Sequence, residues 1–215
     1  MKNDETATTF EQIPNSEAEC LLVERVLAGD GEAYGTLVAT YSRRVYNLAY
    51  RYLGSAEDAE DASQEVFLRA YERLSRFDRG RSFQAWLLAI TANHCIDRLR
   101  RRGPKTMADA EEALQLVAGP DDPEGAVLGR ERSKEMQREL AKLPGAYRMV
   151  LVLRYWQELS CEEIAAVLGS SVGAVKVKLH RARLALLEEM EGKGAAVAER
   201  YFTRPKAGTP AFAAA

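Results

Sequence analysis

Apolar residues recur at intervals of three and four along most of this 215-residue chain, and this spacing constrains the fold more than any other feature. In residues 31–53 the apolar positions form one stripe along a single helix face, at Tyr34, Leu37, Val38, Tyr41, Val45, Leu48 and Tyr52. Few segments show the period-two alternation that is typical of a half-buried strand. The sequence therefore predicts an all-α fold.

Capping residues mark where the predicted helices begin and end. A glycine follows each of the first two helices, and a serine precedes each of the next two. The predicted helices cover residues 18–27, about 31–53, 55–74 and 82–102. Residues 105–131 are weakly patterned and contain Gly119-Pro120, so they are predicted to be a linker. Helices resume at about Arg132, with a break at Leu143-Pro144-Gly145.

Charge is segregated along the chain, although 30 basic and 32 acidic residues nearly cancel. Residues 52–68 and 107–124 hold acids and no basic residue, whereas 98–105 and 164–187 hold basic clusters and no acid. Basic clusters on helices are typical of nucleic-acid binding. An acidic helix would repel DNA and suits a protein partner with a basic surface. A solvated helix face is the alternative for any single cluster.

Residues 159–187 have the pattern of a DNA-binding helix-turn-helix. Ser160 begins a capping box, Gly169 supplies the turn, and Ser170 or Ser171 caps a longer basic helix. The apolar face of that second helix is Val172, Val175, Leu179, Ala182 and Leu186. The side chains that could contact bases or phosphates are Lys176, Val177, His180 and Arg181, flanked by Lys178 and Arg183. A plain helical hairpin with a basic face is the alternative.

Residues 75–102 combine aromatic side chains with arginines. They include Phe77, Phe83, Trp86, Asn93 and the basic run from Arg98 to Arg102. This combination suits single-stranded or melted nucleic acid, because bases stack on aromatic rings or enter a pocket while arginines hold phosphates. The alternative for Phe83 and Trp86 is that both are core residues, because they are three residues apart and so lie on one helix face.

Two segments resemble conserved regions of the bacterial extracytoplasmic-function (ECF) sigma factors. Residues 55–103 (SAEDAEDASQEVFLRAYERLSRFDRGRSFQAWLLAITANHCIDRLRRRG) resemble region 2 of that family. Residues 143–190 (LPGAYRMVLVLRYWQELSCEEIAAVLGSSVGAVKVKLHRARLALLEEM) resemble region 4. The resemblance implies two small helical domains joined by a flexible acidic linker. The expected division is a disordered tail over 1–16, region 2 over 17–103, a linker over 104–131, region 4 over 132–191 and a tail over 192–215.

The resemblance also implies a role for each charged cluster. The helix expected to dock on the clamp coiled coil of core RNA polymerase carries Asp58, Asp61, Gln64, Glu65 and Phe67. The residues expected at the minus-ten element are Phe77, Ser82, Phe83, Trp86, Ile90, Asn93, Arg98, Arg101 and Arg102. Within that set, the pocket for a flipped base corresponds to Phe77, Ile90 and Asn93. The residues expected at the minus-thirty-five element are Ser171, Lys176, Val177, Lys178, His180, Arg181 and Arg183.

One position departs from the family pattern. Val177 stands where a small polar residue is common, so an apolar contact, for example to a thymine methyl group, would replace a hydrogen bond. The segment from Gly192 to Ala215 lies outside the shared core. It is expected to be an inert tail. The alternative is a regulatory tail, in which Tyr201-Phe202 and Phe212 anchor a partner.

The implied function is transcription initiation. The partners are core RNA polymerase, through the clamp coiled coil and the flap of its two large subunits, and promoter DNA. The resemblance also implies an anti-sigma protein, and it implies no catalytic site. No metal or cofactor is expected, because the chain has two histidines and no cluster of metal ligands. An autonomous helix-turn-helix regulator is the alternative, but it leaves the acidic helix and the aromatic-basic unit without a role.

A third hypothesis is an enzyme, since His94, Cys95 and Asp97 are close in sequence. Consecutive helical residues point about 100° apart, however, so they do not form a site together. Cys95 and Cys161 are instead expected to be small buried apolar residues.

The expected location is the cytoplasm, without membrane insertion. The chain has three widely separated cysteines, which suit a reducing compartment. It has no run near the roughly 20 apolar residues that a membrane helix needs, and residues 1–15 contain no apolar run typical of a secretory signal.

Overall fold

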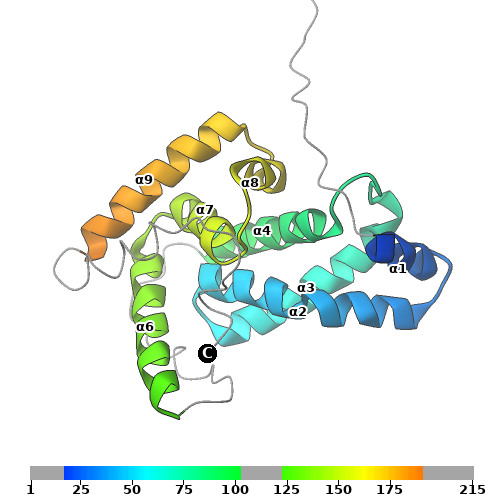
Figure 1. Ribbon diagram of the computed structural model, residues 1–215, viewed down its shortest axis with the longest axis horizontal. Helices are drawn as coiled ribbons and strands as arrows, with labels where there is room; N and C mark the ends of the chain where they lie inside the picture. Colours follow the sequence, from blue (N-terminus) through cyan, green and yellow to red (C-terminus); the bar gives the residue numbers. More distant parts are fainter. Residues whose placement is uncertain (1–16, 103–122, 191–215) are drawn as a thin grey trace, which may run out of the picture.

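The computed structural model describes residues 17–102 and 123–190, with side chains described in 17–101 and 133–190, and these parts are helical without strands (Figure 1). The helices are α1 (Glu17–Leu27), α2 (Gly31–Leu53), α3 (Ala56–Arg73), the short 3-10 helix η1 (Leu74–Arg76), α4 (Phe83–Arg102), α6 (Pro123–Lys142), α7 (Gly145–Tyr155), α8 (Cys161–Leu168) and α9 (Val172–Met190). None of the described helices combines the length and apolar character that crossing a membrane demands. Most of the predicted linker and both predicted tails lie outside the described residues.

The helix ends lie where local capping signals place them. Gly54 adopts the left-handed conformation, with φ of 83°, and ends α2. Ser55 caps α3, and the Ser82 hydroxyl accepts the backbone N–H of Ala85 at 3.3 Å at the start of α4. Asp30 is a further cap that was not predicted from the sequence, since its carboxylate accepts two backbone N–H groups of the first turn of α2. The predicted helices over 31–53 and 82–102 are confirmed.

Helix α6 begins earlier than the sequence predicts. It starts at Pro123, inside the stretch expected to be a linker, rather than near Arg132. Proline suits the first position of a helix, because its missing N–H would have no partner there. Gly125 and a largely polar composition hide the helical period in this turn.

The apolar core forms two clusters. The first joins α1, the first half of α2, the second half of α3 and the start of α4. The second runs without interruption from the end of α2 and the middle of α4 into α6, α7, α8 and α9. The two helical units expected from the sequence therefore share this second cluster, which we call the shared core. The sequence left open whether they are packed together, and in this structure they are.

Helix α7 lies in the middle of the shared core. The sequence predicts a single apolar stripe made of Tyr147, Val150, Leu151 and Tyr155. Instead every residue from Arg148 to Leu153 is buried, while Tyr147 and Tyr155 are half-buried. Contacts on several sides explain the difference, because α7 packs against α2, α8 and α9.

Candidate nucleic-acid interface

The helix-turn-helix is built from local hydrogen bonds. The Ser160 hydroxyl accepts the N–H of Glu163 at 3.1 Å, and the Glu163 carboxylate accepts the N–H of Ser160 at 2.6 Å. This capping box starts α8. Gly169 then turns the chain in the left-handed conformation, with φ of 58°. Ser171 rather than Ser170 caps α9, because its hydroxyl accepts the N–H of Ala174 at 3.2 Å.

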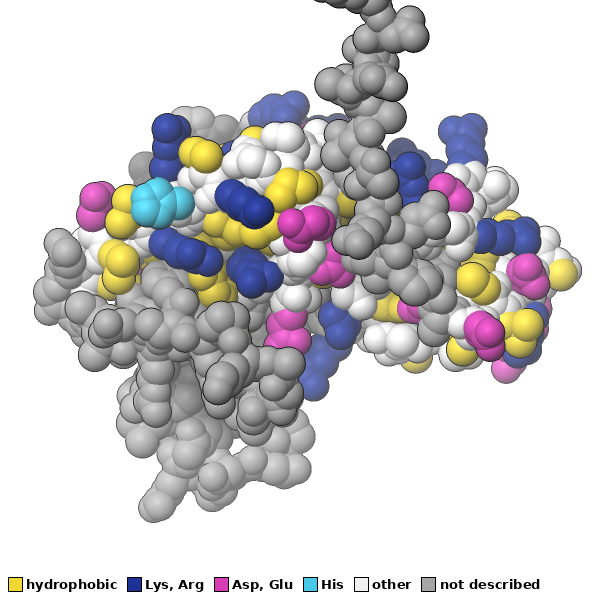
Figure 2. All heavy atoms as spheres, turned by 45° about the horizontal axis from the view of Figure 1, so that its top comes forward, with side chains coloured by type: hydrophobic (Ala, Val, Ile, Leu, Met, Phe, Trp, Pro, Cys, Tyr) yellow, Lys and Arg dark blue, Asp and Glu magenta, His cyan; other side chains and the backbone are white. Residues whose placement is uncertain are grey.

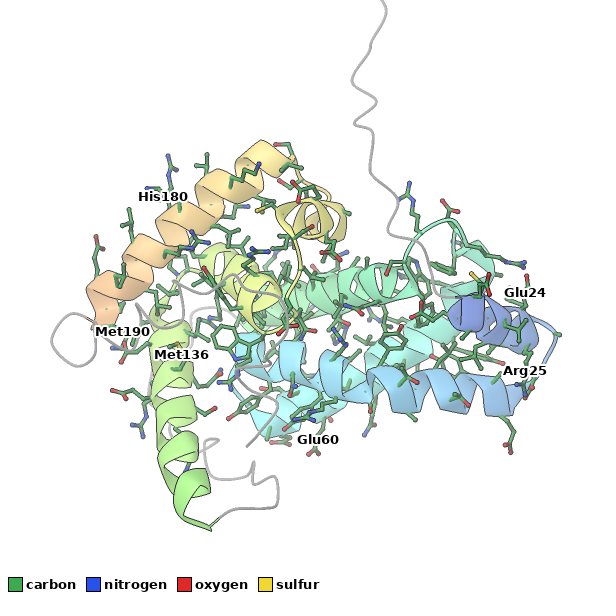
Figure 3. All side chains as sticks on the ribbon, viewed as in Figure 1. Glu24, Arg25, Glu60, Met136, His180 and Met190 are labelled. Carbon is green, nitrogen blue, oxygen red and sulfur yellow. The ribbon has the colours of Figure 1, made fainter. Side chains whose placement is uncertain are left out.

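Helix α9 turns one face to the core and the opposite face outward. The buried residues are Val175, Leu179, Ala182, Leu186 and Met190. The exposed residues predicted to contact DNA are Ser171, Lys176, Val177, His180 and Arg181. Figure 2 shows Lys and Arg side chains gathered around a histidine on this face, and in Figure 3 His180 points away from the body of the molecule. Helical spacing thus correctly placed Lys176, Val177, His180 and Arg181 together on one accessible face, while Ser171 is exposed just before the helix begins.

Two of the predicted minus-thirty-five residues lie differently. Lys178 and Arg183 are half-buried at the edge of the exposed face. Arg183 donates a hydrogen bond from Nε to the Tyr155 hydroxyl at 2.7 Å, and its guanidinium lies 5.7 Å from the centre of that ring. Arg183 therefore holds α9 against α7, and any contact it makes with DNA remains a prediction.

The aromatic residues of the first unit form a compact group. The ring of Phe83 lies 5.5 Å from that of Phe77 and 5.5 Å from that of Trp86, and Phe77 lies 5.1 Å from Trp86. Phe83 is 1% exposed, and Phe77 and Ile90 are also buried, whereas Trp86 is half-buried. Asn93 is exposed on α4. Most of these predicted DNA-binding residues are therefore also part of the core.

The basic end of α4 is joined to the acidic helix α3. The Arg98 guanidinium donates hydrogen bonds to the carboxylates of Asp58 at 2.6 Å and Asp61 at 3.1 Å. Burial disfavours the charge of Arg98, but the hydrogen bonds to Asp61 and Asp58 outweigh it and raise the pKa of Arg98. Arg101 is exposed, while the side chain of Arg102 lies outside the described part of the chain. The structure thus brings one predicted phosphate-binding residue into contact with two residues predicted to bind polymerase.

The residues of α3 predicted to bind polymerase are not equally accessible. Asp61 and Gln64 are exposed, Glu65 and Phe67 are half-buried, and Asp58 is buried. Arg69 bonds Glu65 at 2.7 Å, and this hydrogen bond lowers the pKa of the Glu65 carboxyl. Phe67 packs against the first core cluster.

Two exposed apolar residues on α3 were not among those predicted from the sequence to bind a partner. Leu68 is 62% exposed and Tyr71 is 53% exposed. They follow Gln64 by four and seven residues, so they continue its helix face by one and two turns. Exposed large apolar side chains beside polar ones are typical of protein-binding surfaces. This spacing was the signal that could have identified them.

A cleft between α3 and α4 contains His94. It is lined by Arg69, His94, Asp97, Arg98 and Arg101. Burial, followed by repulsion from Arg69, lowers the pKa of His94. Its Nε2 atom is buried and has no hydrogen-bond partner among the described residues.

Cys95 and Cys161 differ in their burial. Cys95 is fully buried, and burial raises the pKa of its thiol to about 12, which disfavours the thiolate that a nucleophile requires. Cys161 was expected to be buried but is half-buried, because it occupies the first position of α8 near the surface. Within the described ranges, no group of three or more His, Cys, Asp or Glu side chains could hold a metal ion.

Known protein families match both helical units of the chain. The family model for Sigma-70 region 2 matches residues 37–104, and the model for Sigma-70 region 4 matches residues 133–186. The ECF RNA polymerase sigma factor SigW of Bacillus subtilis is 41% identical over 176 residues, which cover 78% of this chain and 94% of that protein. This chain belongs to the ECF sigma factor family.

Other relatives agree with this membership. The ECF sigma-E factor of Escherichia coli is 37% identical over 174 residues, covering 77% of this chain and 91% of that protein. Among solved structures, CnrH in complex with the cytosolic domain of CnrY has a TM-score of 0.63 at 29% identity and covers 82% of this chain and 99% of its own. This ECF sigma factor therefore has the two-region helical fold of its family, with α9 as the second helix of the region 4 helix-turn-helix.

Proposed function

We propose that this sigma factor binds core RNA polymerase through the exposed face of α3, and directs it to promoters through α4 and α9. One observation carries the proposal. A single chain combines an acidic helix that has exposed apolar residues with a basic helix-turn-helix whose outward face holds Lys176, His180 and Arg181. An acidic surface suits a protein partner, and a basic recognition helix suits the major groove.

The proposed polymerase surface consists of Asp61, Gln64, Leu68 and Tyr71, with Glu65 beside them. In Figure 3, Glu60 on α3 and His180 on α9 lie on opposite sides of the molecule. This arrangement supports two surfaces that could be occupied at the same time by different macromolecules. Asp58 is instead proposed to position α3, because it is buried against Arg98.

Binding to core polymerase tests the proposal. The double variant Asp61→Arg with Gln64→Ala should weaken binding to core polymerase, because it reverses a charge and removes an amide at the proposed contact. Arg73→Glu, a charge reversal at an exposed position that lies nine residues after Gln64 and therefore about 180° around the same helix, is the matched control. The double variant should leave the binding of the free chain to a duplex containing a region 4 site intact. Unchanged polymerase affinity in the double variant would contradict the assignment.

The DNA contacts are proposed residue by residue. At the minus-thirty-five element, Lys176, Val177, His180 and Arg181 would contact the major groove, while Ser171 caps the start of α9. At the minus-ten element, Asn93 and Arg101 are accessible, while Phe77, Phe83 and Ile90 would shape the pocket from within the core. Ser82 is proposed to act by fixing the start of α4.

An autonomous helix-turn-helix regulator is the alternative function, and the same binding experiment separates the two. Such a regulator would bind duplex DNA but not core polymerase. Neither function requires a catalytic site, so we propose that the chain is not an enzyme and acts in the cytoplasm with the polymerase. An anti-sigma protein is a further proposed partner, supported by the structure of the relative CnrH, which was solved with the cytosolic domain of CnrY.

A further inference from the structure

Helix α1 contains none of the residues proposed to contact polymerase or DNA. It packs against α2 and η1, at the end of the molecule away from α9 (Figure 1). Its residues Val23 and Val26 are buried in the first core cluster together with Phe77, the residue that follows η1. Helix α1 therefore lies beside the segment through which the chain enters α4.

That segment, residues 77–82, is called the opening loop here, and both of its ends are fixed by the fold. At one end the buried ring of Phe77 lies 5.5 Å from that of Phe83. At the other end the Ser82 hydroxyl accepts the N–H of Ala85 and starts α4. The four residues between them, 78–81, are exposed. Because Phe77 belongs to the proposed pocket for a flipped base, the position of this loop affects that pocket.

The middle of the opening loop is a tight turn. The Asp78 carboxylate accepts the N–H of Gly80 at 3.0 Å, and the N–H of Arg81 donates to the Asp78 carbonyl at 3.0 Å. Aspartate side chains commonly fix turns by bonding the backbone two residues further on. These bonds determine the shape of the loop. They do not determine how the turn is oriented relative to the neighbouring helices.

An ion pair with α1 supplies that orientation. Arg79, in the middle of the turn, donates from Nη1 to the Glu24 carboxylate at 2.9 Å. Helix α1 is itself held in place, because Arg25 donates from Nε and Nη2 to the Asp30 carboxylate at 2.9 and 2.6 Å, where α1 meets α2. Glu24 therefore connects the exposed part of the opening loop to a fixed helix.

This pair is better suited to orienting the loop than to stabilising the fold. Both side chains are slightly more than half exposed, and exposed ion pairs contribute little to stability. A phosphate contact made by Arg79 itself is the alternative role. The Glu24 carboxylate argues against that role, because its negative charge lies against the same guanidinium and would repel a phosphate there.

We propose that Glu24 is a positioning residue for the minus-ten element. By bonding Arg79, it holds the opening loop in the orientation that binds the displaced DNA strand, without touching DNA itself. Helix α1 thereby acts as the support of the strand-opening element. This inference rests on the proposed promoter contacts of Phe77 and α4.

Binding of a single strand to the complex of this chain with core polymerase tests the proposal. The probe is a fluorescent non-template oligonucleotide that carries the minus-ten element of a promoter mapped by run-off transcription, and its anisotropy gives the affinity. Glu24→Gln and Arg79→Gln should each weaken binding about two- to fivefold, the range that an exposed ion pair supplies. The two substitutions change the net charge in opposite directions, so a purely electrostatic effect would change the affinity in opposite directions.

Combined variants separate the pair from its individual charges. Glu24→Gln with Arg79→Gln should bind no more weakly than either single variant, because the same interaction is lost only once. Glu24→Arg with Arg79→Glu should recover most of the affinity, because it rebuilds the pair at unchanged net charge. Glu17→Gln, exposed two turns earlier on the same face of α1, is the matched control and should bind as the unchanged chain does.

Binding to a minus-thirty-five duplex distinguishes positioning from a loss of folding. All these variants should keep that binding, whereas a folding defect would lower it together with binding to the single strand. Unchanged or stronger single-strand binding by Glu24→Gln would overturn the positioning role, and stronger binding would assign Arg79 to a phosphate contact. Failure of the charge swap to restore affinity would overturn it as well. An unchanged chain that does not bind the oligonucleotide would contradict the proposed function, and this inference with it.

Discussion

The two proposed DNA-binding surfaces of this sigma factor differ in how they relate to the core. On α9 the residues proposed to contact DNA and the residues that stabilise the fold are separate, because the former are exposed and the latter are buried. On α4 and the preceding loop the two sets overlap, since Phe77, Phe83 and Ile90 are buried in the first core cluster. If these proposed roles are right, substitutions on the outward face of α9 can change specificity without affecting the fold, whereas substitutions in the proposed strand-opening element also affect folding.

The largest expected effect is on the overlapping set. Phe83→Ala should lower the free energy of unfolding by about 3–5 kcal/mol, because it removes a fully buried ring from the core. His180→Ala, an exposed change on α9, should alter it by less than about 0.5 kcal/mol. Urea unfolding followed by circular dichroism measures both. Equal effects of the two substitutions would break the distinction between the two surfaces.

Arg98 offers a second test of the overlap. Arg98→Ala should lower the free energy of unfolding by about 1–3 kcal/mol, since it leaves the charge of Asp58, whose side chain is 6% exposed, without this partner. Adding Asp58→Asn should recover part of the loss, because a neutral amide is cheaper to bury than a charge. Arg101→Ala, at an exposed position, is the control. A loss no larger than that of the control would show that Arg98 has no stabilising role.

Within region 4, exposed basic residues can be compared with a basic residue that is hydrogen-bonded to the core. Lys176→Ala and Arg181→Ala should each weaken binding to a minus-thirty-five duplex by about 1–3 kcal/mol and relax specificity at one position, if these residues contact bases. Arg183→Ala should mainly lower stability, because Arg183 is held by Tyr155. Binding to a panel of single-base variants of the duplex measures this. A uniform loss across the panel would reassign Lys176 and Arg181 to phosphate contacts.

The smallest effect expected is a pH dependence from His94. The pKa of His94 is lowered in the folded chain, so the unfolded chain binds more protons just below pH 6.5. Neutral His94 therefore makes its whole contribution to the free energy of unfolding above pH 6.5. That contribution is lost as the pH falls through the pKa that His94 has in the folded chain. His94→Gln should therefore flatten the decline in the free energy of unfolding below pH 6.5. An identical decline in both proteins would contradict the burial of a neutral His94.

Much of the fold follows from local signals in the sequence. Glycine and serine caps at Gly54, Ser55 and Ser82 place the ends of α2, α3 and α4, and the capping box at Ser160 places α8. The outward face of α9 follows from helical spacing alone. These features depend on residues within a few positions of one another, which periodicity and propensity can detect.

The remainder depends on contacts between distant segments. The sequence does not indicate that Arg148 is buried. Its guanidinium donates to nearby carbonyls of Leu140, Ala141 and Leu143, but also to the carbonyl of Tyr52, which is far away in the chain. The sequence does not indicate either that α7 is buried on several sides, or that Phe77 and Ile90 belong to the core while Asn93 is exposed. Burial of this kind is decided by which helices pack together, and helical spacing within one segment contains no such information.

Run-off transcription tests the central claim most directly. Core RNA polymerase would be assayed on sheared genomic DNA of the source organism, with and without this chain, and with the Asp61→Arg and Gln64→Ala double variant. The account predicts discrete transcripts that depend on the chain, that disappear with the double variant, and whose start sites share two upstream elements. Specific binding of the chain to duplex DNA without any dependent transcript would contradict it and favour an autonomous regulator.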